Sequence, residues 1–137
     1  MPETITGGCL CGAVRYTSAA QPIVSANCHC RDCQRASGGA YASAVILPRA
    51  AVAITGPVKY FEVKGESGNT VRRGFCPECG SRLFGMPDVA PQIMSVMAGS
   101  LDDPSGFRPA MNIYTQSAQP WVHLDPALPK FPRAPQR

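Results

Sequence analysis

The sequence predicts a single, mainly β domain, and three observations lead to this fold class. Short apolar or alternating segments recur along the chain, whereas no long stretch has helical periodicity. Fourteen prolines and thirteen glycines separate these segments, as in proteins built from many short strands. A chain of 137 residues, 45% of them hydrophobic, is long enough for one core, and no linker divides it.

The expected strands follow one another at short intervals from the N-terminus. Residues 13 to 17 alternate between apolar and polar side chains, as in a half-buried strand. Two later apolar segments end at Pro48 and at Gly56-Pro57. Between the second and third strands, residues 34–37 are expected to form one helical turn before Gly38-Gly39 ends it. The expected strands cover residues 13–17, 23–27, 41–47, 51–55, 58–63, 71–75, 81–84 and 93–98.

The last part of the chain is expected to differ from the domain. Beyond Asp125, prolines recur at positions 126, 129, 132 and 135, and proline cannot donate to a strand ladder. We therefore predict a domain over residues 1–125 and an extended or disordered proline-rich tail over residues 126–137.

Composition also narrows the class of partner and the compartment. The longest apolar run, Ala42 to Pro48, is far below the roughly 20 residues of a membrane span, and the N-terminus lacks a signal pattern. We therefore expect a cytoplasmic protein with no membrane partner. Seven metal-bound thiolates and two Zn²⁺ ions would reduce the formal charge of +4 to about +1, and no Lys/Arg block is present, so no nucleic-acid partner is expected.

Seven cysteines are an odd number, so a framework of disulfides would leave one thiol unpaired. In a reducing compartment, metal sites accommodate four and three cysteines without remainder. The cysteine count therefore favours two Zn²⁺ ions per chain.

Cys76-Pro77-Glu78-Cys79-Gly80 is typical of a zinc knuckle, in which two sulfurs straddle a tight turn. Proline fixes one dihedral early in such a turn, and glycine accepts the positive φ that follows. A closed structural site needs four ligands, and Cys9 and Cys11 are the obvious remaining pair. We expect this site to stabilise the fold directly.

Cys28, Cys30 and Cys33 remain as a second group of candidate ligands, and we expect the rest of the chain to be organised around them. If residues 26 to 30 are extended, the first two sulfurs lie on one side of the strand and the third returns through a short turn. Three thiolates would leave a zinc ion with one open tetrahedral position, as in catalytic sites. Alternatively, His29 or His123 completes the site and both zincs are structural; against this, His29 would point to the opposite face of the strand.

A redox function is a further interpretation, because Cys30-x-x-Cys33 and Cys76-x-x-Cys79 each match a dithiol pattern. Thioredoxin-type pairs lie at a strand-to-helix junction within a βαβ unit. No convincing helix is expected after either pair, so the sequence favours metal binding.

Three cysteine motifs in this order and with these separations make the chain resemble the glutathione-dependent formaldehyde-activating enzyme (GFA) family, also called CENP-V/GFA-domain proteins. Ser100-Leu101-Asp102-Asp103-Pro104 and Pro120-Trp121-Val122 resemble its C-terminal portion. Many members of that family carry a His in the segment before this tryptophan, and here the sequence departs from them with Met111-Asn112-Ile113. The motifs are Gly8-Cys9-x-Cys11-Gly12, Cys28-His29-Cys30-x-x-Cys33 and Cys76-Pro77-x-Cys79-Gly80.

The resemblance implies an Mss4-like fold with a structural zinc held by four cysteines and a catalytic zinc held by three. It also implies a carbon–sulfur lyase that joins glutathione to formaldehyde or a related small aldehyde. The implied ligands are Cys9, Cys11, Cys76 and Cys79 for the structural zinc, and Cys28, Cys30 and Cys33 for the catalytic zinc.

A site with three thiolates is negatively charged, so arginines are candidates to neutralise it or to bind the carboxylates of glutathione. Arg31 and Arg35 are the main candidates, followed by Arg72 and Arg73. The alternative function is a non-enzymatic zinc-binding module, a thiol carrier or a protein-interaction domain, because fold does not fix function. A methionine sulfoxide reductase relative needs another free cysteine, and the metal assignment leaves none.

Two smaller features have simple interpretations. Asp102-Asp103 precede Pro104 and are expected to be turn residues rather than paired acid–base carboxylates. Trp121, Phe75 and Phe84 are expected to be core aromatics.

Overall fold

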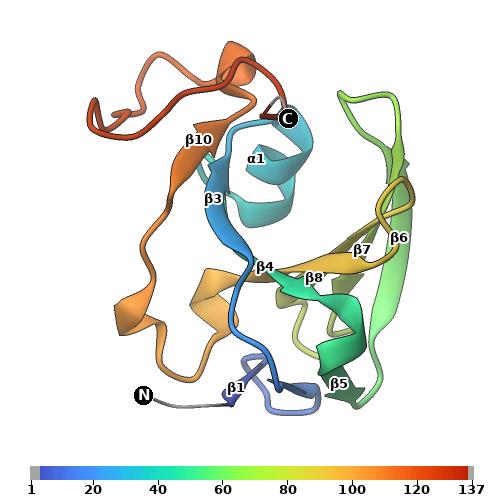
Figure 1. Cartoon of the computed structure of the whole chain (residues 1–137). Coiled ribbons are helices and arrows are strands. Elements are labelled where there is room, and N and C mark those ends of the chain that lie inside the picture. Colours follow the sequence, from blue (N-terminus) through green and yellow to red (C-terminus); the bar gives the residue numbers. More distant parts are fainter. Residues whose placement is uncertain (1–3, 136–137) are drawn as a thin grey trace.

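The computed structural model describes residues 4–135. Within this range the chain forms ten strands in two sheets, one α-helix and four short 3-10 helices (Figure 1). The fold is mainly β and forms a single domain, as predicted. The 3-10 helices are η1 (Arg49–Ala51), η2 (Ala98–Ser100), η3 (Pro104–Gly106) and η4 (Thr115–Ser117).

The smaller sheet has three antiparallel strands in the order β1 (Ile5–Gly8), β2 (Arg15–Ser18) and β5 (Val52–Thr55). Strand β2 alternates between exposed and buried residues, as its sequence predicts. Strand β1 was not predicted, because its last two residues are glycines. A side chain at Gly7 would collide with the Tyr16 ring on β2, which explains a glycine inside this strand.

The larger sheet has seven strands in the order β10-β3-β4-β9-β8-β7-β6. Neighbouring strands are antiparallel except for β10, which pairs in parallel with β3. The bounds are β3 (Val24–Cys28), β4 (Ala42–Pro48), β6 (Lys59–Lys64), β7 (Thr70–Phe75), β8 (Arg82–Pro87), β9 (Ile93–Met97) and β10 (Met111–Ile113).

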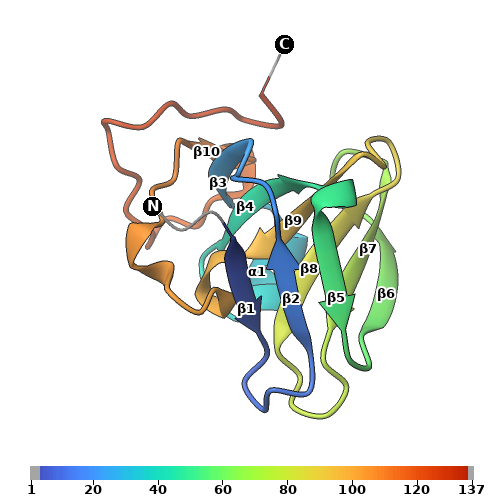
Figure 2. The ribbon, with the colours of Figure 1, turned by 60° about the horizontal axis from the view of Figure 1, so that its bottom comes forward.

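The main core lies between the two sheets, with the smaller sheet in front of the larger one in Figure 2. Tyr16 of β2 is 1% exposed, and its ring meets that of Phe84 edge to face with centroids 5.4 Å apart. Other fully buried side chains are contributed by both sheets. They include Val14, Leu47, Leu83, Met94 and Val96.

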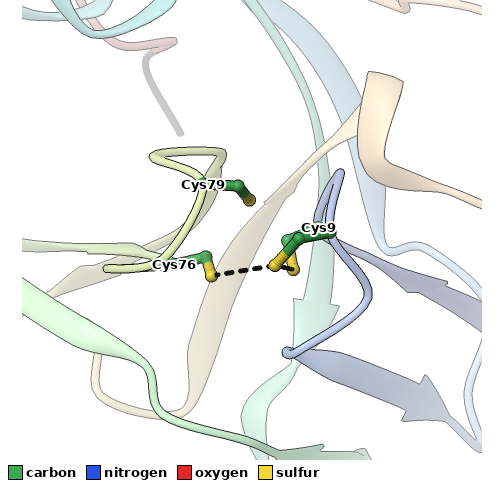
Figure 3. Close-up of side chains that lie close together, drawn as sticks. Cys9, Cys76 and Cys79 are labelled. Carbon is green, nitrogen blue, oxygen red and sulfur yellow. Dashed lines mark hydrogen bonds between the residues drawn. The ribbon is translucent and has the colours of Figure 1, made fainter.

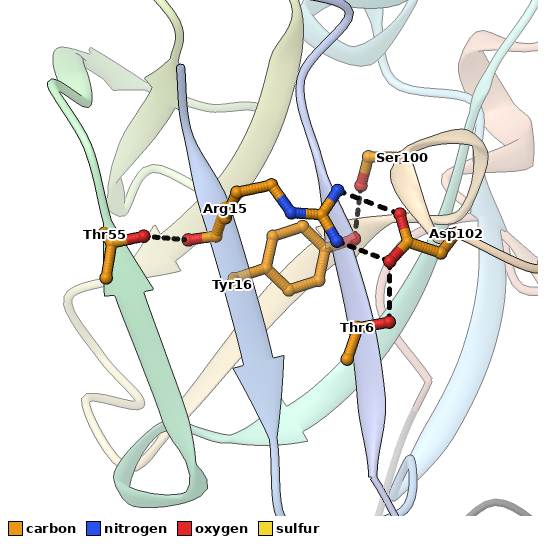
Figure 4. Close-up of polar contacts among 6 residues, drawn as sticks. All are labelled: Thr6, Arg15, Tyr16, Thr55, Ser100 and Asp102. Atoms are coloured by element: carbon orange, nitrogen blue, oxygen red, sulfur yellow. Dashed lines mark hydrogen bonds and ion pairs between the residues drawn. The ribbon is translucent and has the colours of Figure 1, made fainter. Parts of the chain in front are cut away.

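A polar contact holds the smaller sheet to the segment after β9 (Figure 4). Arg15 donates two hydrogen bonds to the Asp102 carboxylate, which also accepts a 2.6 Å hydrogen bond from the Thr6 hydroxyl. The hydrogen bonds from Arg15 and Thr6 lower the pKa of Asp102 to about 2. Asp102 is therefore an ion-pair partner, whereas Asp103 caps η3 through the Ser105 amide and is a turn residue as predicted.

Helix α1 (Arg31–Ser37) begins earlier than the single turn predicted for residues 34–37. Cys30 is the N-cap residue, and its sulfur accepts a hydrogen bond from the Cys33 amide at 3.3 Å. The sequence did not predict a cysteine as the helix cap. Gly38 ends the helix in the left-handed conformation (φ 72°), as its position predicts. The expectation that no helix follows Cys30 is therefore wrong.

Backbone hydrogen bonds join residues 129–133 of the proline-rich tail to β10 and the residues that follow it, and residues 136–137 of the predicted tail are outside the described range. The Asn112 amide donates to the Pro129 carbonyl at 2.9 Å, and the Phe131 amide donates to the Asn112 carbonyl at 3.0 Å. This contact leaves Asn112 with partners on both sides, β3 and the tail.

In the part of the chain that the structure describes, no helix has the length and apolar character needed to cross a membrane.

Candidate metal centres

Four cysteines from two distant loops meet at one point at the edge of the two sheets (Figure 3). Cys9 and Cys11 lie in the loop between β1 and β2, and Cys76 and Cys79 lie in the loop between β7 and β8. Their sulfurs all lie within 4.8 Å of one another. The structure therefore brings together the four residues predicted as the structural ligands.

The spacing within this four-cysteine cluster fits a tetrahedral zinc ion. The Cys9 and Cys11 sulfurs are 3.7 Å apart, and those of Cys11 and Cys76 are 3.8 Å apart. Bonds of about 2.3 Å in a tetrahedron place sulfurs about 3.8 Å apart. None of the seven cysteines, all within the described residues, forms a disulfide.

The loops around this cluster supply polar groups to the sulfurs. The Val14 amide donates to the Cys9 sulfur at 3.2 Å. Hydrogen bonds from Ser81 lower the pKa of Cys79 to about 5, and the bond from its hydroxyl has a larger effect than the bond from its backbone amide. Gly80 has φ 78°, as predicted for the residue that follows a zinc knuckle.

The second cluster contains Cys28, Cys30 and Cys33, whose sulfurs also lie within 4.8 Å of one another. Cys28 ends β3, Cys30 caps α1, and Cys33 lies in its first turn. Cys30 and Cys33 are 7% and 8% exposed, whereas Cys28 is half-buried, so solvent reaches the three-cysteine cluster mainly at Cys28. Within residues 4–135, no fourth His, Cys, Asp or Glu joins this cluster.

Crowding of the three thiols separates their pKa values in the metal-free protein. Hydrogen bonds from Cys28 and Cys33 lower the pKa of Cys30 to about 2. Hydrogen bonding with Cys30 and Cys33, together with burial, raises the pKa of Cys28. The free cluster therefore favours one thiolate, and a divalent cation would have to displace the remaining protons.

Arg73 is the cation placed against this cluster. Its Nη1 and Nη2 atoms each lie 3.8 Å from the Cys33 sulfur, and its buried Nε atom has no hydrogen-bond partner among residues 4–135. Arg72 points elsewhere, since it lies over the Tyr60 ring and 3.8 Å from a carboxylate oxygen of Glu62. Of this neighbouring pair, only Arg73 is placed to balance the charge of the three thiolates.

Arg31 and Arg35 do not contact the cysteine sulfurs. Both are exposed on the outer side of α1, where they line a shallow surface hollow of about 440 Å³. Trp121, predicted as a core aromatic, is 69% exposed at this hollow, whereas Phe84 is buried and Phe75 half-buried. The prediction for Trp121 is therefore wrong, because the chain after η4 runs over the surface of α1 instead of entering the core.

His29, directly after β3, is fully buried and lies outside the three-cysteine cluster, as its position between two cysteine ligands predicts. Its Nε2 atom lies 2.9 Å from the side-chain oxygen of Asn112, and its ring packs 4.9 Å from that of Tyr41. Asn112 is thus a buried partner of His29. His123 is exposed and belongs to neither cluster.

Two residues near the three-cysteine cluster were not singled out from the sequence. Tyr114 packs against the cluster with a left-handed backbone (φ 54°), the only non-glycine residue with positive φ in the described chain. Glu66, at the tip of the β6–β7 hairpin, accepts the Arg31 amide at 2.8 Å. No sequence motif marks either residue, because both come near the cluster only through contacts between segments that are distant in sequence.

A second cavity of about 700 Å³ lies between the two clusters. Cys9 and Gly80 of the four-cysteine loops line one side. Ala42 and Met97, which also pack against the three-cysteine cluster, line the other. Its volume is in the range of small-molecule sites.

The model of the glutathione-dependent formaldehyde-activating enzyme family matches residues 4–117. The chain belongs to this family. Both cysteine clusters of this GFA-family chain lie within the matched range, whereas Trp121 lies beyond it.

The comparison with solved structures supports the same architecture. A Rhodobacter sphaeroides protein of known crystal structure is 19% identical to this GFA-family chain, with a TM-score of 0.58. The match covers 76% of this chain and 91% of that one. At this identity it shows the fold alone, and the predicted Mss4-like class is confirmed. A comparison with curated proteins finds no match.

Proposed function

We propose that this protein is a zinc-dependent carbon–sulfur lyase that forms or cleaves the adduct between a thiol and a small aldehyde. Glutathione is the proposed thiol and formaldehyde, or a related aldehyde, its partner. The observation that carries the proposal is a separate cluster of three free cysteines, Cys28, Cys30 and Cys33, in a member of the GFA family. Three protein thiolates are one ligand short of a closed zinc site.

The donor set of each cluster fits zinc, because clustered thiolates are the ligands that zinc prefers in structural and catalytic sites. Cys9, Cys11, Cys76 and Cys79 would hold the structural ion, and the other three cysteines the catalytic one. A zinc ion on three thiolates supplies an open position that favours the thiolate form of an added thiol.

The protein groups around the cluster would control charge and access. Arg73, 3.8 Å from the Cys33 sulfur, would offset the negative charge of the thiolates. Half-buried Cys28 marks the side from which a small molecule can approach. In the proposed reaction the thiol would lose its proton, its sulfur would bond to the aldehyde carbon as the C=O π bond opens, and the oxygen would take up that proton to give a hemithioacetal; cleavage reverses these steps.

We also propose that Arg31 and Arg35 bind the carboxylates of glutathione. Both residues are exposed, and within residues 4–135 neither forms an ion pair, although the Arg31 guanidinium donates a hydrogen bond to the Gln34 side-chain oxygen. Paired hydrogen bonds from arginine suit carboxylates of a peptide. The free thiols fit a reducing compartment, which supports a cytoplasmic location.

The test compares zinc-loaded protein with a Cys30→Ser variant in an assay of adduct formation from glutathione and formaldehyde. The unmodified protein should accelerate the reaction above the uncatalysed rate, and the variant should not. Circular dichroism must show that the variant is folded. Equal rates for the two folded proteins would refute the lyase proposal.

The alternative is a non-enzymatic zinc-binding module, a thiol carrier or a protein-interaction domain. The low exposure of Cys30 and Cys33 favours it, because a buried centre limits access to substrates. Glutathione binding separates the two proposals. A zinc-loaded protein that binds no thiol and leaves the reaction rate unchanged would favour the module.

A further inference from the structure

The tip of the β6–β7 hairpin lies against the first residues of α1, although the two segments are far apart in sequence. One Glu66 carboxylate oxygen accepts the Arg31 amide at 2.8 Å. The other accepts the Ser117 hydroxyl at 2.7 Å and the Gln116 side-chain amide at 3.4 Å. Glu66 therefore connects the hairpin, the start of the helix and η4.

The peptide group on the other side of Cys30 is held by the same network. The Gln34 side-chain amide donates to the His29 carbonyl at 2.8 Å and to the Ser117 carbonyl at 2.9 Å. Gln34 is 5% exposed, so these hydrogen bonds form away from solvent. Both residues that flank Cys30 are thus fixed, His29 through its carbonyl and Arg31 through its amide.

We propose that Glu66 is a positioning residue for Cys30 and so for metal binding by the three-cysteine cluster. It acts through the Arg31 amide and Ser117 and does not touch the sulfurs. The inference rests on the proposed metal site at Cys28, Cys30 and Cys33. Groups that orient metal ligands typically change metal affinity by about ten- to a hundredfold.

The carboxylate of Glu66 suits this role, because one oxygen accepts from the Arg31 amide while the other accepts from the side chains of Ser117 and Gln116. A glutamine keeps one acceptor oxygen, but its amide group cannot accept the second hydrogen bond. Alanine removes both acceptors and leaves the Arg31 amide without its partner. The hairpin tip keeps other contacts when the Glu66 side chain is changed, such as the 3.0 Å hydrogen bond from the Arg133 guanidinium to the Glu66 backbone carbonyl.

The experiment titrates the metal-free full chain with Co²⁺ and follows the thiolate-to-cobalt absorption bands. The absorption that the three-cysteine cluster contributes is the part of these bands that is lost in the Cys30→Ser variant. We expect Glu66→Ala to weaken this contribution about ten- to a hundredfold in affinity, and Glu66→Gln and Ser117→Ala to have smaller effects. Glu62→Ala, on the same hairpin but 3.8 Å from Arg72 at the surface, is the matched control and should leave it unchanged.

A second readout is hydrogen exchange of the segment from Cys30 to Gln34, which should accelerate in Glu66→Ala while exchange in β8 stays unchanged.

Unchanged cobalt affinity in Glu66→Ala would overturn the positioning role but leave the proposed function intact. Equal weakening of both clusters would also overturn it, because that result indicates general destabilisation. If Glu66→Ala does not fold, the smaller changes in Glu66→Gln and Ser117→Ala decide, and wild-type affinity in both would refute the proposal. Absence of a Cys30-dependent band in the unmodified protein would contradict both the metal site and this inference.

Discussion

Cys76→Ser removes one ligand from the four-cysteine cluster, and we expect a large loss of stability. Cys76 is fully buried, and its sulfur lies 3.8 Å from that of Cys11, 65 residues away. The cluster therefore joins the loop of the smaller sheet to that of the larger one. Zinc binding to four thiolates is coupled to folding by about 10–16 kcal/mol in small domains, so losing one ligand of four should cost about 2.5–4 kcal/mol.

This cost is a large part of the roughly 5–15 kcal/mol by which a domain is stable, and it should lower Tm by roughly 10–15 °C. Thermal unfolding followed by circular dichroism, with zinc content measured on the same samples, tests this. Cys28→Ser is the control, because it alters the half-buried member of the other cluster and should lower Tm less. A Cys76→Ser protein with wild-type Tm and zinc content would refute the reasoning.

Three further predictions concern charge, the ion pair and the aromatic residues. Arg73→Met should lower the affinity of the three-cysteine cluster for Zn²⁺, as measured by chelator competition, because it removes the cation 3.8 Å from the Cys33 sulfur; unchanged affinity would contradict this role. Because Arg15 and Thr6 lower the pKa of Asp102 from 3.8 to about 2, the ionised carboxylate stabilises the fold above pH 4 and this contribution is lost as pH falls toward 2. Asp102→Asn should therefore have a lower Tm than the unmodified protein at pH 7, with a difference that vanishes near pH 2. Phe84→Ala should cost about 3–5 kcal/mol in urea unfolding, whereas Trp121→Ala, at a residue 69% exposed, should change stability little; similar losses would contradict the placement of the two rings.

The cysteine clusters could be predicted from the sequence because ligand spacing restricts geometry. Cys28 and Cys30 share one side of a strand, and Cys76-Pro77-Glu78-Cys79-Gly80 encodes its own turn. Once these local shapes are given, few arrangements of seven free thiols remain. The alternation of β2 and the helix stop at Gly38 are local signals of the same kind.

What the sequence did not predict depends on contacts between distant segments. Helix α1 begins at Arg31 because a cysteine sulfur caps it and a hairpin carboxylate holds its first amide. Trp121 is exposed because the chain after η4 crosses the surface of α1. No periodicity or local motif marks Glu66 or Asn112 as partners of the site.

The corrected helix also bears on the redox interpretation. Cys30-x-x-Cys33 is followed by a helix, but the flanking strands β3 and β4 are antiparallel, so the unit is not the parallel βαβ unit of thioredoxin-type pairs. The Cys28 sulfur lies beside those of Cys30 and Cys33, so the group is a set of three ligands instead of a dithiol. Metal binding therefore remains the better interpretation of these cysteines.

Native mass spectrometry of the intact chain tests most directly whether the seven sulfurs divide into two metal centres. The account predicts two zinc ions in the unmodified protein and one in a folded variant with Cys28, Cys30 and Cys33 all replaced by Ser. A single zinc ion in the unmodified protein, or two in the triple variant, would contradict it.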